Sequence, residues 1–333
     1  MGKSASKKKY EDLFDAASAG DLLGVKYFVE KEGVLVDTLN KRHETAAHIA
    51  VKNGHLDVLK YLLNKNPFLF QVEDVEHNVL LHIALKRGLL DIVDFLIDQY
   101  KADVLKNTAK GETPLQLAAA NGHVHIVQYL IDKREVNMLE HASNSYGDTA
   151  VHIAAKKGCL NVVGYFMEKK EVDVNILNTK GQPPVFSAAI GNHSNIVRYL
   201  VEEYDANVTM IDKDHNTILQ YAFENENLAV SRYLLDEKHF DININQANDM
   251  GETLLFTAIA RHNMELLKYI VDEKKADINN PDRFGEYPLH KAVKTNYLKI
   301  VQYLVAHGAN PAQKNFYGKT PYEVAKLYNK YLQ

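Results

Sequence analysis

Apolar and polar residues return in the same order about every 34 residues along the chain. Each period holds a short apolar stretch, a polar break and a second apolar stretch, of which Ile126-Val127-Gln128-Tyr129-Leu130 is an example. In the second stretch the apolar positions follow an i, i+3, i+4 spacing, which predicts a helix with one buried face. We therefore expect each period to form a helix, a short turn, a second helix and a turn-rich loop.

The periods align residue by residue over most of the chain. The position that opens each period, numbered zero, is occupied by Glu11, Thr45, Val79, Thr113, Thr149, Pro183, Thr217, Thr253, Tyr287 and Thr320. Alanine stands at plus five in every period, tyrosine is common at plus sixteen, and glycine recurs at plus nine and minus two. Alanine lets two helices approach closely, and glycine suits the left-handed backbone of a helix end or a turn. Because Glu226 and His262 replace the glycine at plus nine, we expect the periods from Thr217 and Thr253 to be the weakest.

These motifs resemble the ankyrin repeat. The segment Thr113-Pro114-Leu115-Gln116-Leu117-Ala118-Ala119 with Asn121-Gly122-His123 is close to the family consensus, and so is Tyr287-Pro288-Leu289-His290 with His307-Gly308-Ala309-Asn310. The resemblance covers residues 11–333, after a basic tail at residues 1–10. It implies an all-α solenoid of stacked helix-turn-helix units with connecting hairpin loops, because one unit cannot bury its apolar face alone. We expect the additional residues of the longer periods, around 98–103, 134–145 and 239–247, to lie in surface loops.

The composition narrows the range of functions. The chain of 333 residues is 46% hydrophobic, which excludes wholesale disorder, and its net charge of −4 argues against a dedicated nucleic-acid binder. The single cysteine, Cys159, excludes an internal disulfide and a cysteine-cluster metal site. No apolar run is long enough for a transmembrane helix, and residues 1–10 lack the apolar stretch of a secretory signal.

Histidine is the residue type that most suggests catalysis or metal binding. His43 and His48 nearly form the zinc-protease motif, but they are five residues apart and the motif requires four. Histidine recurs at plus three as His48, His82, His152 and His290. The resemblance implies that these side chains hydrogen-bond the backbone of neighbouring loops, and metal binding is the alternative. The tyrosines at plus sixteen are expected to pack between second helices with their hydroxyls near water, a cofactor stripe being the alternative. We predict no enzymatic activity, no cofactor and no metal.

The first six residues fit the N-myristoylation pattern M-G-x-x-x-[ST], in which Gly2 accepts the acyl chain. One myristoyl chain binds a membrane only marginally and needs a second signal. Lys3, Lys7, Lys8 and Lys9 would supply it by electrostatic attraction to the anionic inner leaflet. A solvated basic tail without a lipid is the alternative.

The resemblance also implies that a partner contacts the concave face, made of loop tips and first helices. The residues at these positions that we expect to bind it are Lys41, Arg42, Lys52, Lys86, Arg87, Lys110, Tyr146, Lys156, Lys157, Lys180, Phe284, Phe316 and Tyr317. Their excess of positive charge suggests an acidic protein partner. Lysines that are merely solvated, and packing of Phe284 and Phe316 between adjacent loops, are the alternatives.

We therefore predict a monomeric, non-catalytic interaction scaffold or adaptor in the cytoplasm, tethered to a membrane through its acylated tail. The alternatives are a soluble adaptor, a secreted bacterial effector that binds a host protein, and the regulatory domain of an enzyme whose catalytic domain lies outside this sequence.

Overall fold

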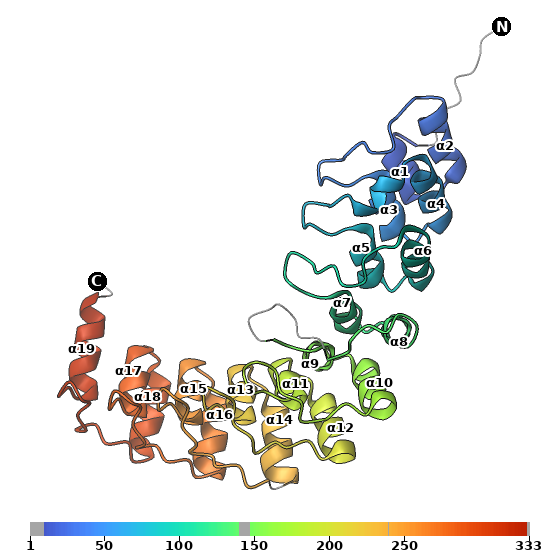
Figure 1. Cartoon of the computed structure of the whole chain (residues 1–333). Coiled ribbons are helices and arrows are strands. Elements are labelled where there is room, and N and C mark those ends of the chain that lie inside the picture. Colours follow the sequence, from blue (N-terminus) through green and yellow to red (C-terminus); the bar gives the residue numbers. More distant parts are fainter. Residues whose placement is uncertain (1–9, 140–146, 239, 332–333) are drawn as a thin grey trace. The chain divides into compact units, whose positions relative to one another are not determined.

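The computed structural model describes residues 10–139, 147–238 and 240–331, and it divides into two compact units, Met1–Ala154 and Ala155–Gln333. The secondary structure of the described residues is helical, apart from one isolated bridge between Ile211 and Thr217 (Figure 1). None of the described helices is both long enough and apolar enough to cross a bilayer. The expected all-α repeat architecture is confirmed.

Helices alternate between first and second members of a pair along both units (Figure 1). The N-terminal unit contains α1 (Leu13–Ser18), α2 (Leu22–Glu30), α3 (Ala46–Lys52), α4 (Leu56–Lys65), the 3₁₀ helix η1 (Pro67–Gln71), α5 (Leu80–Arg87), α6 (Leu90–Tyr100), α7 (Pro114–Ala120) and α8 (Val124–Asp132). The division between the units falls within α9 (Ala150–Lys157). The C-terminal unit contains α10 (Leu160–Lys170), α11 (Pro184–Ile190), α12 (Ser194–Tyr204), α13 (Ile218–Glu224), α14 (Leu228–Arg232), the π-helix η2 (Tyr233–Glu237), α15 (Leu254–Ala260), α16 (Met264–Lys268), the π-helix η3 (Tyr269–Glu273), α17 (Pro288–Lys294), α18 (Leu298–Ala306) and α19 (Pro321–Tyr331).

The core of each unit forms where successive first helices stack. In the N-terminal unit α1, α3, α5 and α7 contact one another in order, and in the C-terminal unit α11, α13, α15, α17 and α19 do the same. The alanine at plus five favours this close approach, because its methyl group occupies little space between two helices. From Ala16 to Ala292 this alanine is fully buried in every period, whereas Ala325 in α19 is half-buried.

The residue at position zero caps the first helix. In α7 the Thr113 hydroxyl accepts a hydrogen bond from the Gln116 N–H at 3.2 Å, and the Gln116 side chain accepts one from the Thr113 N–H at 2.9 Å. This reciprocal arrangement satisfies two backbone donors that a helix start otherwise leaves free. In the first period the cap is Asp12, one residue after the aligned Glu11.

Backbone with positive φ occurs at plus nine, as expected for a helix end. Gly88 has φ of 76°, and Glu226 and His262 adopt 55° at the same position although they carry side chains. The glycine has a second role that the sequence did not reveal: a Cβ on Gly88 would lie 2.7 Å from the ring of His123 in the next period. Glycine at position 88 therefore permits both the left-handed turn and close contact with the following period.

The expectation that all additional residues lie in surface loops is wrong in part. Residues 98–100 are helical, because α6 continues to Tyr100 and ends at Lys101, which has φ of 54°. In two later periods the second helix widens into a π turn, η2 and η3, before it ends. Residues 134–139 and 240–247 do lie in loops. A helix can thus absorb an additional residue at its end, through a left-handed residue or a π turn.

Candidate protein-interaction surface

The histidines at plus three hold neighbouring loops together. The backbone N–H of Thr45 donates to His48 Nδ1 at 3.1 Å, so that Nε2 carries the proton and donates to the Val72 carbonyl at 3.1 Å. His82 donates in the same way to the Lys106 carbonyl at 2.8 Å. Burial lowers the pKa of both His48 and His82, which keeps the rings neutral. The interpretation of these histidines as loop-bridging residues is confirmed for His48 and His82.

Other plus-three side chains also hydrogen-bond the next loop, but at the carbonyl directly before its position zero. His290 donates to the Lys319 carbonyl at 2.9 Å, and the amide of Gln116 donates to the Asp148 carbonyl at 3.0 Å. Gln220 donates to the Glu252 carbonyl at 3.2 Å. Among the described residues no group of three or more His, Cys, Asp or Glu side chains is placed to hold a metal ion.

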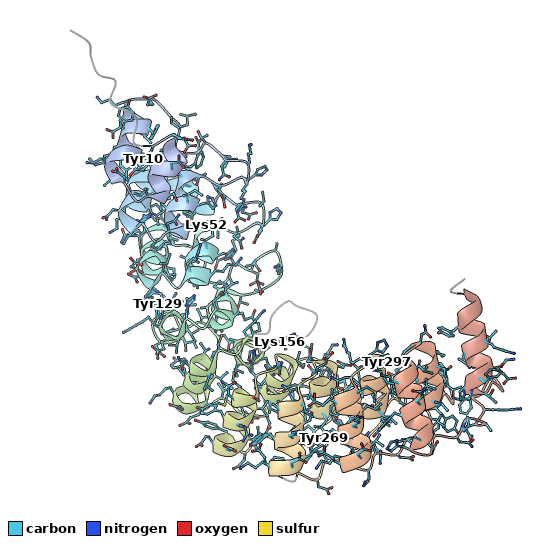
Figure 2. The ribbon with its side chains drawn as sticks, turned by 180° about the vertical axis from the view of Figure 1, so that it is seen from behind. Tyr10, Lys52, Tyr129, Lys156, Tyr269 and Tyr297 are labelled. Carbon is cyan, nitrogen blue, oxygen red and sulfur yellow. The ribbon has the colours of Figure 1, made fainter. Side chains whose placement is uncertain are left out.

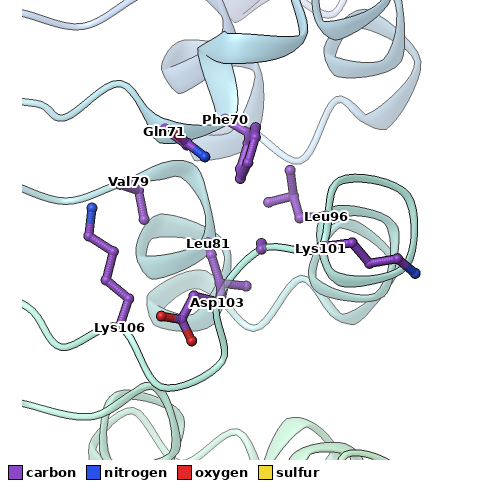
Figure 3. A pocket seen from close by; sticks show the side chains of 9 residues that line it. Phe70, Gln71, Val79, Leu81, Leu96, Lys101, Asp103 and Lys106 are labelled. Carbon is purple, nitrogen blue, oxygen red and sulfur yellow. The ribbon is translucent and has the colours of Figure 1, made fainter.

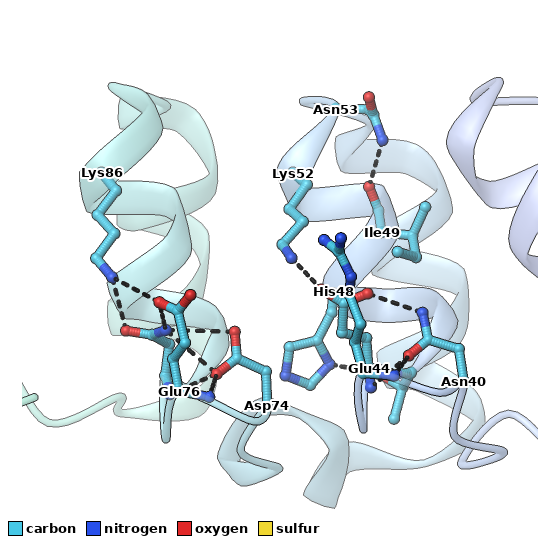
Figure 4. Close-up of polar contacts among 12 residues, drawn as sticks. Asn40, Glu44, His48, Ile49, Lys52, Asn53, Asp74, Glu76 and Lys86 are labelled. Atoms are coloured by element: carbon cyan, nitrogen blue, oxygen red, sulfur yellow. Dashed lines mark hydrogen bonds and ion pairs between the residues drawn. The ribbon is translucent and has the colours of Figure 1, made fainter. Parts of the chain in front are cut away.

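Two of the lysines expected to bind a partner are engaged within their own repeat. Lys52 forms an ion pair with the buried carboxylate of Glu44, and Lys86 Nζ donates to Asn78 Oδ1 at 2.8 Å (Figure 4). Burial alone would raise the pKa of Glu44, but hydrogen bonds from Lys52 and Asn40 outweigh it and lower the pKa. These two lysines therefore stabilise the junction between loop tip and first helix.

Four other basic residues of the N-terminal unit remain available. They are exposed and form no ion pair with another described residue: Lys41, Arg42, Arg87 and Lys110. We call them the basic tip residues. Three lie in the loop tips before α3 and α7, and Arg87 ends α5. The tip before α3 is joined to the tip before α5, since the Val75 N–H donates to the Arg42 carbonyl at 3.2 Å.

A hollow of about 420 Å³ lies between the loop tips that precede α5 and α7. Lys110, one of the basic tip residues, lines it together with Lys86, Glu76, Glu112 and Thr108. A second pocket, of about 290 Å³, lies between η1 and α6 (Figure 3). Its lining includes Phe70, Leu81 and Leu96, with Lys101 and Lys106 at its edge. Lys106 is paired with Glu73 at 2.9 Å.

The remaining expected contact residues belong to the C-terminal unit or lie outside the described residues. Lys156 and Lys180 are half-buried and Lys157 is exposed. Phe284 is 38% exposed, Phe316 78% and Tyr317 70%. Tyr146, Gly2, Lys3, Lys7, Lys8 and Lys9 lie outside the described residues.

The second helices carry a network of tyrosines and charges that sequence reasoning missed. The hydroxyl of Tyr61 donates to Glu30 at 2.9 Å, and that of Tyr303 donates to Asp272 at 2.7 Å, in each case 31 residues earlier. Burial and the bond to Glu30 raise the pKa of Tyr61 to about 12. The expectation of hydroxyls near water is wrong for Tyr233 and Tyr269, whose exposed fractions are 0% and 1%.

Arginines complete this network. The guanidinium of Arg198 lies 4.2 Å from the ring centroid of Tyr233 and also pairs with Glu237 at 2.5 Å. The guanidinium of Arg232 lies 4.8 Å from the ring centroid of Tyr269. Figure 2 labels Tyr269. The signal was present in the sequence, because an acidic residue recurs three positions after the tyrosine, as in Glu30 and Asp272. On this side the charged groups are used to join neighbouring repeats.

Comparison with protein families agrees with this architecture. A family described as ankyrin repeats (3 copies) matches residues 13–108, 81–178 and 166–248, and one described as ankyrin repeats (many copies) matches residues 270–325. The chain belongs to the ankyrin-repeat family. Ankyrin repeats are protein-interaction domains, and no catalytic family is found. A search of curated proteins gave no match.

Proposed function

We propose that this ankyrin-repeat protein is a non-catalytic scaffold or adaptor that binds an acidic region of a protein partner through the N-terminal unit. The observation that supports the proposal is a difference between the charged groups of the second helices and those of the loop tips. Arginines of the second helices, such as Arg198, are held by tyrosines and carboxylates, whereas the basic tip residues form no ion pair with another described residue. A partner can therefore supply the missing negative charge without first breaking an internal ion pair.

The expected contribution of these charges is to specificity and association rate. An exposed ion pair contributes roughly 0.2–1 kcal/mol, so four of them cannot by themselves hold a partner tightly. A cluster of one sign does steer an oppositely charged partner during encounter, and this effect weakens as salt is added. The hollow beside Lys110 offers a recess in which an acidic side chain could be surrounded by protein.

Charge reversal tests this surface. The partner recovered by affinity purification with the wild type should be lost when Arg42, Arg87 and Lys110 are all replaced by glutamate. Lys60→Glu is the matched control, because Lys60 is an exposed cation of a second helix, with its ammonium 5.6 Å from the Phe95 ring centroid. Retention of the partner by the triple variant, or its loss in the Lys60→Glu control, would contradict the proposal.

We also propose that residues 1–10 tether the scaffold to the anionic inner leaflet. The support is the sequence pattern around Gly2 and the lysines that follow it. A soluble adaptor or a secreted effector is the alternative. Co-expression with an N-myristoyltransferase should add one acyl chain to the wild type and none to Gly2→Ala, as measured by intact mass. An unmodified wild type would exclude the tether and favour the soluble adaptor.

A further inference from the structure

The C-terminal unit carries a row of exposed apolar side chains on consecutive loop tips. Met250 precedes α15, Phe284 precedes α17, and Phe316 and Tyr317 precede α19. Their exposed fractions are 38%, 38%, 78% and 70%. Three of the four are aromatic, and we call the set of four the aromatic tip row. Three positions before zero, the tips of the N-terminal unit carry Arg42, Glu76 and Lys110, and the tip before α5 also carries Val75, which is 54% exposed. A row of large apolar side chains on consecutive tips is therefore a property of this part of the chain.

Backbone hydrogen bonds fix the row in place. The Arg283 N–H donates to the Met250 carbonyl at 3.0 Å, and the Phe316 N–H donates to the Phe284 carbonyl at 3.3 Å. The ring of Phe316 also covers Gly285, where a Cβ would lie 2.4 Å from it. Phe316 therefore packs on its neighbouring tip and remains exposed. Few rotatable groups need to be ordered when a partner binds such a surface.

Side-chain acceptors stiffen each tip in the same way. Asp282 Oδ1 accepts from the N–H groups of Phe284 and Glu286, both at 2.8 Å. Asn315 Oδ1 accepts from the N–H groups of Tyr317 and Lys319, both at 3.0 Å. The carboxylate of Asp282 is thereby occupied by its own turn.

The exposed charge around the row is mainly positive. The Glu323 carboxylate, whose pKa is lowered by hydrogen bonds from Thr320 and by the charges of Lys319 and Lys314, accepts from the Thr320 N–H at 2.8 Å. Exposed basic residues with no ion pair among the described residues flank it: Arg283, Lys314 and Lys319. The nearby carboxylates are already engaged, because Glu286 is paired with Lys294 and Glu252 with Lys291 at 3.1 Å. The guanidinium of Arg283 lies 5.0 Å from the ring centroid of Phe284, which places a cation beside the apolar surface.

We propose that the aromatic tip row is a second docking surface, which binds an extended acidic segment of a protein partner. The apolar tips would receive apolar side chains of the segment, and Arg283, Lys314 and Lys319 would receive carboxylates between them. Packed helices are roughly 8–10 Å apart, which sets the distance between successive tips. Because an extended chain rises about 3.3 Å per residue, three residues span one repeat. The segment should therefore present apolar side chains at i, i+3 and i+6.

Peptide display tests whether the aromatic tip row binds such a segment, and it does not require the partner to be known. Random 12-residue peptides on phage are selected against the wild-type protein, and enriched sequences are synthesised and titrated by fluorescence anisotropy. We expect enriched peptides with apolar residues three apart and Asp or Glu between them. The double variant Phe316→Ser, Tyr317→Ser should bind them at least tenfold more weakly. Arg283→Glu should weaken binding at low salt and less at high salt.

The matched control is Phe68→Ser, because Phe68 is 77% exposed but belongs to η1 in the N-terminal unit. It should leave binding unchanged, as should the Arg42, Arg87 and Lys110 glutamate variant. This inference is therefore independent of the basic tip residues, and either surface can fail without the other. Circular dichroism of each variant checks that the helices remain.

Three results would overturn the inference. One is the absence of enriched peptides, and another is equal binding of the peptides to the Phe316→Ser, Tyr317→Ser variant. The third concerns membranes, which also attract aromatic and cationic side chains. Binding of unacylated wild type, but not of the double variant, to vesicles of phosphatidylserine and phosphatidylcholine would assign the row to a lipid surface.

Discussion

His82 lacks the hydrogen bond that Thr45 provides to His48, because Val79 occupies the position of that threonine. The Nδ1 atom of His82 is buried and has no hydrogen-bond partner, whereas His48 Nδ1 lies 3.1 Å from the Thr45 nitrogen and 2.9 Å from its hydroxyl. An unsatisfied buried acceptor costs about 1–3 kcal/mol. One substitution at position zero thus creates a weakness in the repeat that contains α5.

Val79→Thr should stabilise this repeat by about 1 kcal/mol, since the new hydroxyl can donate to His82 Nδ1. The reciprocal change, Thr45→Val, should destabilise the preceding repeat by a similar amount. Amide hydrogen exchange in α5 and α3 measures the two effects separately. Unchanged exchange in α5 of Val79→Thr would show that His82 Nδ1 has another partner, such as a bound water molecule.

Stability should fall as the pH drops below about 6.5, the pKa of histidine in the unfolded chain. Burial lowers the pKa of His48 and His82 in the folded protein, so between that lowered pKa and the unfolded value of about 6.5 the unfolded chain binds more protons. Their contribution is complete above pH 6.5 and is lost as the pH falls through the folded pKa. The loss is at most about 1.4 kcal/mol per histidine per pH unit.

Replacement by glutamine separates this effect from general acid denaturation. Gln116 and Gln220 occupy the same position in other repeats and also hydrogen-bond the next loop, so His48→Gln and His82→Gln should keep the fold. Thermal unfolding of the double variant should depend less on pH in this range than that of the wild type. An identical pH profile would mean that other groups control the acid transition.

Much of the fold was predictable, because each repeated position reports a short-range constraint. Ala50 and its equivalents are buried where first helices stack, which the recurrence of alanine predicts. The positive φ of Glu226 is predicted by its alignment with glycines. The π turns η2 and η3 were not predictable, since an additional residue can be placed in a helix end or in a loop at similar cost.

The candidate site was less accessible from sequence than the fold. The list of basic residues did not distinguish Lys52, which Glu44 neutralises, from Arg42, which is unpaired. Both occupy variable positions of the repeat, and only the side-chain geometry shows that plus seven reaches back to minus one. The bond between Tyr61 and Glu30 was hidden for a related reason, because it joins two repeats.

Glu226→Gly should stabilise the repeat from Thr217 by about 1 kcal/mol, because Glu226 has φ of 55° and glycine adopts this conformation without steric cost. In the wild type we expect faster hydrogen exchange over residues 217–275 than over 113–170, and Glu226→Gly should reduce that difference. His262→Gly is a less favourable test, since the His262 ring stacks on Tyr297 with centroids 5.3 Å apart. Uniform exchange along the chain would refute the expected weakness.

The glycines at plus nine offer a test of the contact between consecutive repeats. Gly54 and Gly88 have φ of 78° and 76°, so alanine at either should cost about 1 kcal/mol from the backbone alone. Their surroundings differ. A Cβ added to Gly54 would lie 3.4 Å from Leu89, whereas a Cβ added to Gly88 would lie 2.7 Å from the ring of His123. The His123 ring cannot easily withdraw, because Nε2 donates to the Lys86 carbonyl at 3.0 Å. Gly88→Ala should therefore cost about 1–3 kcal/mol more than Gly54→Ala. Denaturant unfolding of both variants measures the difference, and equal destabilisation would mean that the left-handed backbone is the only requirement for glycine at this position.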